Sequence, residues 1–334
     1  MSHRIAEFYS GIGGMHYAWR QAGLPGEVVA AFDINTVANS VYHHNFPTVR
    51  PNQRLIESIP LRFYRALQAD VFLMSPPCQP YTRVGLQKGS TDARAKSFLF
   101  ILDLLRDLGT EAPRYILLEN VVGFETSDTR ELAVTRLTEC GYAWKEFIIN
   151  PKQLGIPNSR ARYYLLAKRQ PLGFVGHPPC GELGSNGQPL TTATQCVPSE
   201  NAASCSTLGD YLGNSASDLA LWTMYGLPGE VLSKRFEVLD VVTLTSRGSC
   251  CFTKAYTHYA KDSGSVLQWS PDGQPVEPNR DGRYRYFTEH EIARLMGFPT
   301  PSEFTFPTDI TRNQRYRLLG NSLSINVLSF ATVV

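Results

Sequence analysis

Short apolar runs alternate with longer segments of helical periodicity through the first half of this 334-residue chain. Residues that recur at the spacing of one helix face predict helices over 15–21, 36–44, 96–108 and 129–140. Runs rich in β-branched and aromatic residues predict strands over 4–8, 28–32, 70–74, 115–118, 145–149 and 163–167. Strands that alternate with helices are typical of an α/β fold, and we expect a doubly wound, mostly parallel sheet.

The pattern changes after Lys168. Residues 171–215 are dense in Gly, Pro, Ser, Asn and Thr and show little periodicity, which predicts long loops. A second, smaller domain is therefore expected to begin near residue 171. For the rest of the chain, the sequence favours strands over 236–245 and 250–259, turns over 270–285, a helix over 289–296 and a packed apolar segment over 317–328.

Composition limits the class of protein. With 43% hydrophobic residues the chain can bury one sizeable core, and its net charge of +2 gives no strong argument for a polyanionic partner. The seven cysteines are odd in number and lack C-x-x-C spacing, so we expect neither a disulfide framework nor a metal site. No leader peptide and no run of about 20 apolar residues is present, so we expect a soluble cytoplasmic protein, also nuclear, with no membrane partner.

A glycine-rich segment closes the first predicted strand. Residues 7–14, Glu-Phe-Tyr-Ser-Gly-Ile-Gly-Gly, lead into a helix, an arrangement that lets a ligand approach backbone N–H groups. His16 stands where a dinucleotide fingerprint would have its third glycine. Asp33 ends the next strand, where a carboxylate can accept hydrogen bonds from both ribose hydroxyls of an adenosine cofactor. The alternative is a tight turn followed by a surface aspartate.

Three further segments carry candidate chemistry. Cys78 lies in Ser-Pro-Pro-Cys-Gln-Pro after strand 70–74, a position that suits a nucleophile, although a cysteine between prolines can also be an inert packing residue. Glu119 ends the strand that starts at Tyr115, as either a proton handler or a solvated charge. Arg160 and Arg162 would share one side of an extended segment, at an active site or on an exposed sheet edge.

Taken together and in order, these segments resemble the cytosine-5 methyltransferase superfamily. The set comprises the glycine-rich opening, the acidic strand end, Pro-Pro-Cys-Gln, Glu-Asn-Val, Arg-x-Arg and the late Gly320-Asn321-Ser322. Cys-Phe-Thr at 251–253 is similar to a mark of the tRNA-methylating branch. The similarity covers about residues 3–168 and 246–330 and lapses across 171–230.

The resemblance implies a Rossmann-like class I methyltransferase fold. Its catalytic domain, which binds S-adenosylmethionine and releases S-adenosylhomocysteine, would comprise residues 1–170 and 287–334, with a target-recognition domain over 171–286. The implied cofactor-binding residues are Phe8, Ser10, Gly11, Gly13, Asp33, Ile34, Glu57, Asn321 and Ser322. The implied catalytic residues are Cys78, Glu119, Arg160 and Arg162. The substrate-binding candidates are Gln79, Thr82, Arg83, Arg247, Cys251, Thr253, Lys254 and Tyr256.

The chemistry explains these residue types. A thiolate that adds to carbon 6 of cytosine makes carbon 5 able to attack a sulfonium methyl group, and Cys78 would supply it. Glu119 at ring nitrogen 3 and an arginine at the carbonyl oxygen would lessen the charge that develops on the ring. No side chain predicts the base that removes the carbon-5 proton, so we expect an ordered water.

The substrate implied by the resemblance is a tRNA, at cytosine 38 of the anticodon loop of aspartate tRNA, bound by a monomer. DNA is the alternative. A catalytically idle nucleic-acid-binding homologue would be expected to lack the cysteine, the Glu-Asn-Val or the arginines, and all are present. A methyltransferase for protein or small molecules would share the glycine loop, but the Pro-Pro-Cys-Gln segment argues against it.

Overall fold

The computed structural model describes residues 2–77, 95–174, 205–213, 218–269, 283–299 and 301–333. For residues 330–333 it describes only the backbone. The chain forms two compact units. Unit 1 comprises Met1–Ile149, Ala161–Cys196 and Leu328–Val334, and unit 2 comprises Asn150–Arg160 and Val197–Val327. The candidates Cys78, Gln79, Thr82 and Arg83 lie outside the described residues.

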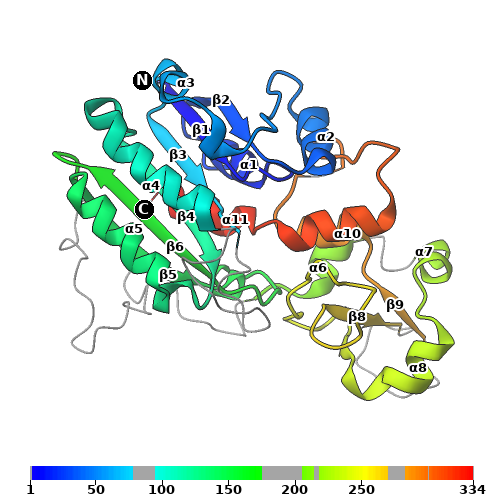
Figure 1. The fold of residues 1–334 in the computed structure, drawn as a ribbon. Helices are drawn as coiled ribbons and strands as arrows, with labels where there is room; N and C mark the ends of the chain where they lie inside the picture. The colour runs from blue at the N-terminus through cyan, green and yellow to red at the C-terminus, as the bar shows by residue number, and fades with distance from the viewer. Residues whose placement is uncertain are drawn as a thin grey trace, which may run out of the picture. The chain divides into compact units, whose positions relative to one another are not determined.

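Unit 1 is built on one six-stranded sheet of order β2-β1-β3-β4-β6-β5 (Figure 1). Among the described strands of this sheet, β6 runs opposite to the other five, so the predicted mostly parallel α/β sheet is confirmed. The strands are β1 (His3–Phe8), β2 (Gly26–Phe32), β3 (Val71–Met74), β4 (Tyr115–Val121), β5 (Tyr142–Ile149) and β6 (Arg162–Arg169). The helices are α1 (Gly14–Gln21), α2 (Thr36–Asn45), α3 (Leu61–Leu67), α4 (Lys96–Leu108) and α5 (Asp128–Glu139).

Side-chain alternation along β1 shows how both faces of the sheet are covered. Ala6 and Phe8 belong to the main apolar cluster, together with residues of α4 and α5, which cover that face (Figure 1). Glu7 points to the other face, where the hydroxyl of Tyr42 on α2 donates to it. A sheet covered on both faces needs apolar strands, which is why the strand predictions succeeded.

The strand register sets where the loops begin. Phe8 pairs with Phe32 and with Met74, and Met74 pairs with Leu118. The carboxyl ends of β1, β2, β3 and β4 therefore lie at one edge of the sheet. Because β6 is antiparallel to β4, its first residue, Arg162, lies at that edge as well. Open α/β sheets bind ligands at this edge.

Unit 2 holds a three-stranded sheet of order β7-β8-β9 and several short helices. The predicted helix at 289–296 is confirmed as α9, whereas the strand predicted over 250–259 is wrong: Cys250–Thr253 has no regular structure and a turn follows. The elements are α6 (Leu208–Leu212), α7 (Leu219–Met224), α8 (Gly229–Arg235), β7 (Asp240–Val242), β8 (Ser265–Gln268), β9 (Tyr284–Tyr286), α9 (Glu289–Leu295) and α10 (Arg312–Asn321), and α11 (Ile325–Val333) follows.

The two compact units divide the chain differently from the predicted domains. Residues 150–160 and 287–327 belong to unit 2, whereas the resemblance placed both in the catalytic domain. Compactness does not decide which residues contact a substrate, so the functional domain assignment stays a prediction. Within the described part of the chain, no helix is both long and apolar enough to cross a membrane.

Candidate active site

The loop after β1 has a strained backbone. Tyr9, Gly11 and Gly13 all have positive φ, at 59°, 52° and 87°. A side chain at Gly13 would meet the ring of Phe46 at 2.7 Å, so glycine is required there. Tyr9 is not a glycine, and a strained residue of this kind is most often found at functional sites.

Asp33 ties this loop to the end of β2. Its carboxylate accepts hydrogen bonds from the backbone N–H of Gly11 at 2.8 Å and of Asn35 at 2.8 Å. Burial raises the pKa of Asp33, and these two hydrogen bonds lower it. Each carboxylate oxygen keeps a second lone pair for a ligand.

Two of the candidate cofactor residues carry buried polar atoms without partners. Ser10 Oγ and Glu57 Oε2 have no hydrogen-bond partner among the described residues. Buried polar groups are almost always paired, so these two atoms are available to hydrogen-bond a ligand. Ile34, beside Asp33, is 65% exposed. Phe8, in contrast, is fully buried and stacks on Phe32 at 4.9 Å, so its side chain is a core residue here.

Glu119 and Arg162 meet at the same edge of the sheet. Glu119 lies on β4 and is 8% exposed, and its Oε1 lies 3.5 Å from Nε of Arg162 at the start of β6. Arg162 also donates from Nη1 to the carbonyl of Ala161 at 2.8 Å. The antiparallel step from β4 to β6 brings the two side chains together. The sequence predicted both residues at a site but not that they would pair.

The start of the Pro-Pro-Cys segment belongs to this edge. β3 ends at Met74, between the end of β1 and the end of β4, and Ser75 Oγ donates to the carbonyl of Tyr9 at 3.2 Å. Pro76 and Pro77 are the last described residues before Cys78. The nucleophile candidate therefore follows within four residues of a strand that adjoins β4, which carries Glu119.

Arg160, the second arginine of the motif, is 4% exposed within unit 2. Its Nη1 donates to Cys251 Sγ at 3.2 Å and to the carbonyl of Phe252 at 3.0 Å. Its Nη2 donates to the carbonyls of Gly320, at 3.2 Å, and of Ser322. The two arginines thus have different partners, although the sequence treated them as one pair.

A cavity of about 460 Å³ in unit 2 combines the turn after Cys-Phe-Thr with α10. Lys254 and Arg317 are exposed cationic residues, and none of the lining residues is acidic. The lining comprises Lys254, Ala255, Tyr256, Thr257, His258, Asn313, Arg317 and Asn321. The sequence analysis named Lys254 as a substrate-binding candidate, but it did not name Asn313 or Arg317. Nothing in the pattern of α10 indicated which of its residues would face this turn.

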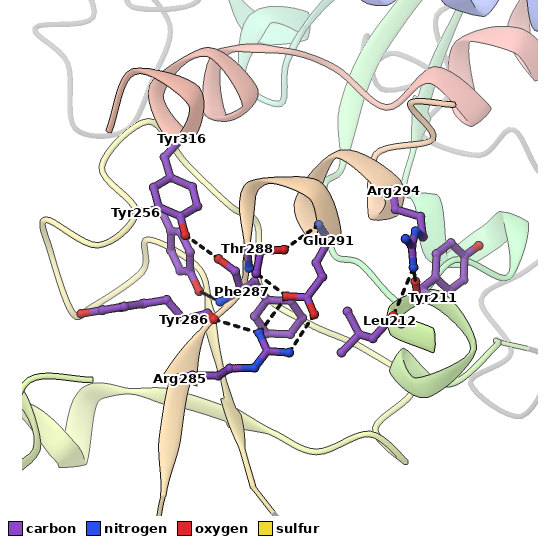
Figure 2. A network of polar contacts seen from close by, with 10 residues as sticks. All are labelled: Tyr211, Leu212, Tyr256, Arg285, Tyr286, Phe287, Thr288, Glu291, Arg294 and Tyr316. Carbon is purple, nitrogen blue, oxygen red and sulfur yellow. Dashed lines mark hydrogen bonds and ion pairs between the residues drawn. The ribbon is translucent and has the colours of Figure 1, made fainter. Parts of the chain in front are cut away.

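Figure 2 shows what holds the two walls of this cavity. The hydroxyl of Tyr256 accepts from the backbone N–H of Phe287 at 2.9 Å, and the hydroxyl of Tyr316 on α10 donates to the Phe287 carbonyl at 2.6 Å. Below them, Arg285 and Glu291 form a fully buried ion pair at 2.7 Å. The backbone of one residue, Phe287, is thus hydrogen-bonded to both walls.

These contacts show what holds the substrate-binding candidates of unit 2. Tyr256 is 3% exposed and its hydroxyl also donates to the carbonyl of Ser265, so most of its ring is packed in the core of the unit. Arg247 donates to the carbonyl of Cys205, and Thr253 accepts from the N–H of Ala255. Lys254 remains exposed.

The model of the C-5 cytosine-specific DNA methylase family matches residues 3–332. The chain belongs to this family. A tRNA (cytosine(38)-C(5))-methyltransferase of Mus musculus is 42% identical to this methylase over 98% of this chain and 91% of its own length. A DNA (cytosine-5)-methyltransferase of Dictyostelium discoideum is 34% identical, over 98% and 92%. A crystal structure of a Spodoptera frugiperda DNMT2 mutant superposes with a TM-score of 0.81 at 38% identity, covering 99% of both chains.

Three buried or half-buried polar side chains of this methylase, none of them a sequence-based candidate, form a hydrogen-bonded series that starts at Glu7. Glu7 is 1% exposed and accepts from the Tyr42 hydroxyl at 2.8 Å, and that hydroxyl lies 2.9 Å from Nδ1 of His16. Burial raises the pKa of Glu7 to about 8, although the hydrogen bonds from Tyr42 and from the backbone of His16 lower it, and the charge of Asp33 raises it further.

This raised pKa predicts how stability depends on pH. Because the folded pKa lies above that of the unfolded chain, the contribution of Glu7 is fully present below about pH 4.5 and is lost as the pH rises toward 8. The glutamine of Glu7→Gln cannot ionise. The free energy of unfolding of this variant, relative to that of the wild type, should therefore increase by up to about 1.4 kcal/mol for each pH unit in this window. Urea unfolding of both proteins across the window measures the difference. A difference that does not change with pH would contradict the assignment.

Proposed function

We propose that this protein transfers a methyl group from S-adenosylmethionine to carbon 5 of cytosine 38 in the anticodon loop of a tRNA, aspartate tRNA in particular. The observation that carries the proposal is near-full-length similarity, at about 40% identity, to relatives named tRNA (cytosine(38)-C(5))-methyltransferase. The pairing of Glu119 with Arg162 at the ligand-binding edge of the sheet supports the chemistry.

The residues around the glycine loop fit the cofactor. Asp33 has lone pairs for ribose hydroxyls, Ser10 and Glu57 offer buried polar atoms, and exposed Ile34 offers an apolar surface for an adenine ring. Gly13 keeps the loop free of a side chain. When bound, S-adenosylmethionine supplies an electrophilic methyl group. Its product, S-adenosylhomocysteine, would occupy the same residues.

The protein's own residues would then prepare the cytosine. The thiolate of Cys78 adds to carbon 6, and the electron pair displaced from the ring double bond makes carbon 5 nucleophilic. Glu119 would donate a proton to ring nitrogen 3, and Arg162 would bond the carbonyl oxygen, so the charge pushed onto the ring is neutralised. After methylation, an ordered water would accept the carbon-5 proton, and the electron pair left behind would re-form the ring double bond and expel the Cys78 thiolate. Ring nitrogen 3 would then return its proton to Glu119.

The cavity of unit 2 supports an RNA substrate. Lys254 and Arg317 have no ion-pair partner among the described residues, as expected of side chains that bind phosphates. An anticodon loop already presents partly unstacked bases, so the target cytosine leaves its stack at a lower cost than in duplex DNA. A small unit with a cationic cavity is then enough for recognition.

Asp33→Ala should weaken binding of S-adenosylhomocysteine by roughly 1.5–3 kcal/mol, or about 10- to 150-fold, the scale for hydrogen bonds to a charged group. Calorimetry measures the dissociation constant directly. Asp107→Ala, which removes an exposed carboxylate from the end of α4, is the control and should leave affinity unchanged. Equal affinities of Asp33→Ala and the wild type would remove Asp33 from the cofactor site.

The substrate is tested by methyl transfer at one stated salt concentration, because phosphate contacts make affinity salt-dependent. We expect an unmodified aspartate tRNA transcript to be methylated roughly tenfold or more faster than a DNA duplex of matched cytosine content, since extrusion from a duplex costs a few kcal/mol. A transcript with uridine at position 38 should not be methylated. Equal rates on duplex and transcript would favour the DNA activity for which the Dictyostelium relative is named.

A further inference from the structure

We propose that Arg160 is a positioning residue rather than a catalytic one, and that it couples the Cys-Phe-Thr element to Gly320–Ser322 at the C-terminal end of α10. Through these segments it would set the affinity for RNA and for cofactor together, while Arg162 alone acts on the base. The inference rests on the proposed function, since it divides the roles of two arginines that the family resemblance grouped as catalytic.

The hydrogen bonds of Arg160 carry the first step. A guanidinium has four Nη hydrogens, and here they bind Cys251 Sγ and three backbone carbonyls, those of Phe252, Gly320 and Ser322. A bond from Nη to the carbonyl oxygen of a cytosine would require one of these to break, which would leave a buried acceptor unpaired. Arg162, in contrast, contacts the carboxylate of Glu119 at the ligand-binding edge of the sheet, and its Nη1 donates to the carbonyl of Ala161.

The packing between the two segments carries the second step. A Cβ built at Gly320 would overlap with the backbone nitrogen of Lys254 and the carbonyl carbon of Thr253, so the end of α10 and the Cys-Phe-Thr element lie in direct backbone contact. Arg160 spans this contact, with one Nη on each segment. A guanidinium can bridge the two segments because it carries two Nη groups in one plane, whereas a lysine ammonium donates from a single point.

The two segments carry residues proposed for both ligands. Lys254, which follows Cys-Phe-Thr, and Asn321 both line the cationic cavity, and Asn321 and Ser322 are also the residues that the resemblance assigns to the cofactor. Loss of the guanidinium should therefore weaken both affinities together. A residue that touched only the base would change neither.

A second link makes it reasonable to expect that variants of Arg160 fold. Tyr256 and Tyr316 still bind the backbone N–H and C=O of Phe287, independently of Arg160 (Figure 2). Removing the guanidinium should loosen the contact at Gly320 without separating the Cys-Phe-Thr turn from α10.

The test compares Arg160→Ala, Arg160→Lys and Arg162→Lys with the wild type. Calorimetry measures the dissociation constant of S-adenosylhomocysteine, and filter retention measures that of tRNA. Single-turnover assays with tRNA and S-adenosylmethionine both saturating measure the rate. For Arg160→Ala and Arg160→Lys we expect both dissociation constants to rise about tenfold or more, with saturated rates within a few-fold of the wild type. Arg162→Lys should show the reverse. Methylguanidinium should restore the affinities of Arg160→Ala, and methylammonium should not.

Two results would overturn the inference. One is a loss of saturated rate in Arg160→Lys that matches Arg162→Lys, with both affinities unchanged, which would make Arg160 catalytic. The other is normal affinity for both ligands with a reduced fraction of binding-competent protein, which would make it merely structural. If the wild type fails to methylate tRNA at all, the proposed function fails, and the cofactor-affinity measurements still test the coupling.

Discussion

Replacing Cys78 with alanine is expected to abolish methyl transfer while affinity for S-adenosylmethionine stays within a few-fold of the wild type. The reason is that the thiolate forms the bond to carbon 6, and without it carbon 5 of cytosine is a poor nucleophile. The proposed cofactor contacts, in contrast, are made around Asp33, Ser10 and Glu57. Single-turnover assays on the tRNA transcript and calorimetry on the same preparations separate the two effects.

Two other cysteines serve as controls for this prediction. Cys140→Ala removes a thiol at the end of α5, packed against the main core, and should leave the rate unchanged. Cys251→Ala removes only one of the four Nη contacts of Arg160, so its loss of activity should be smaller than that of Cys78→Ala. Measurable turnover by Cys78→Ala would refute the covalent mechanism, and equal losses in Cys78→Ala and Cys251→Ala would reverse the two assignments.

Glu119→Gln should lower the saturated rate by about two to four orders of magnitude with cofactor affinity kept, as for a lost proton donor. The amide has nearly the same shape, so the contact with Arg162 can persist while the proton that would go to ring nitrogen 3 is lost. Rapid-quench measurement with both substrates saturating gives the rate of the chemical step.

Glu139→Gln is the matched control for this substitution, since Glu139 is an exposed residue at the end of α5 that pairs with Arg136. Its rate should equal that of the wild type. A Glu119→Gln variant with an unchanged rate would show that the carboxyl does not take part in the reaction, whatever its distance from Arg162.

The sequence predicted the sheet of unit 1 well because both of its faces are covered. Strands such as Val71–Met74 are buried on both sides, so their apolar runs are long and unambiguous. The helix Leu61–Leu67 was not predicted, since only Tyr64 in it is fully buried and its apolar face is narrow. In unit 2, the apolar and aromatic residues of 250–259 suggested a strand, but Phe252 and Tyr256 fill a core from within a turn.

The candidate site was predictable to the extent that it lies at strand ends. Asp33 and Glu119 follow buried strands, and parallel register brings such ends to one edge. The division between Arg160 and Arg162 was not predictable, because two residues of one motif gain different partners only through distant segments at Cys251 and Gly320. The buried carboxyl of Glu7 was hidden for the same reason, since Tyr42 lies 35 positions away in the sequence.

The central claim, a covalent cytosine-5 reaction through Cys78 on a tRNA loop, is tested most directly by trapping. A tRNA with 5-fluorocytosine at position 38 carries fluorine where a proton would have to leave, so the adduct formed after methylation cannot resolve. We predict a complex that survives denaturing electrophoresis, forms only with S-adenosylmethionine, and yields on digestion an RNA-linked peptide containing Cys78. Failure to form this complex by a protein that methylates the unfluorinated transcript, or linkage at a different cysteine, would contradict the account.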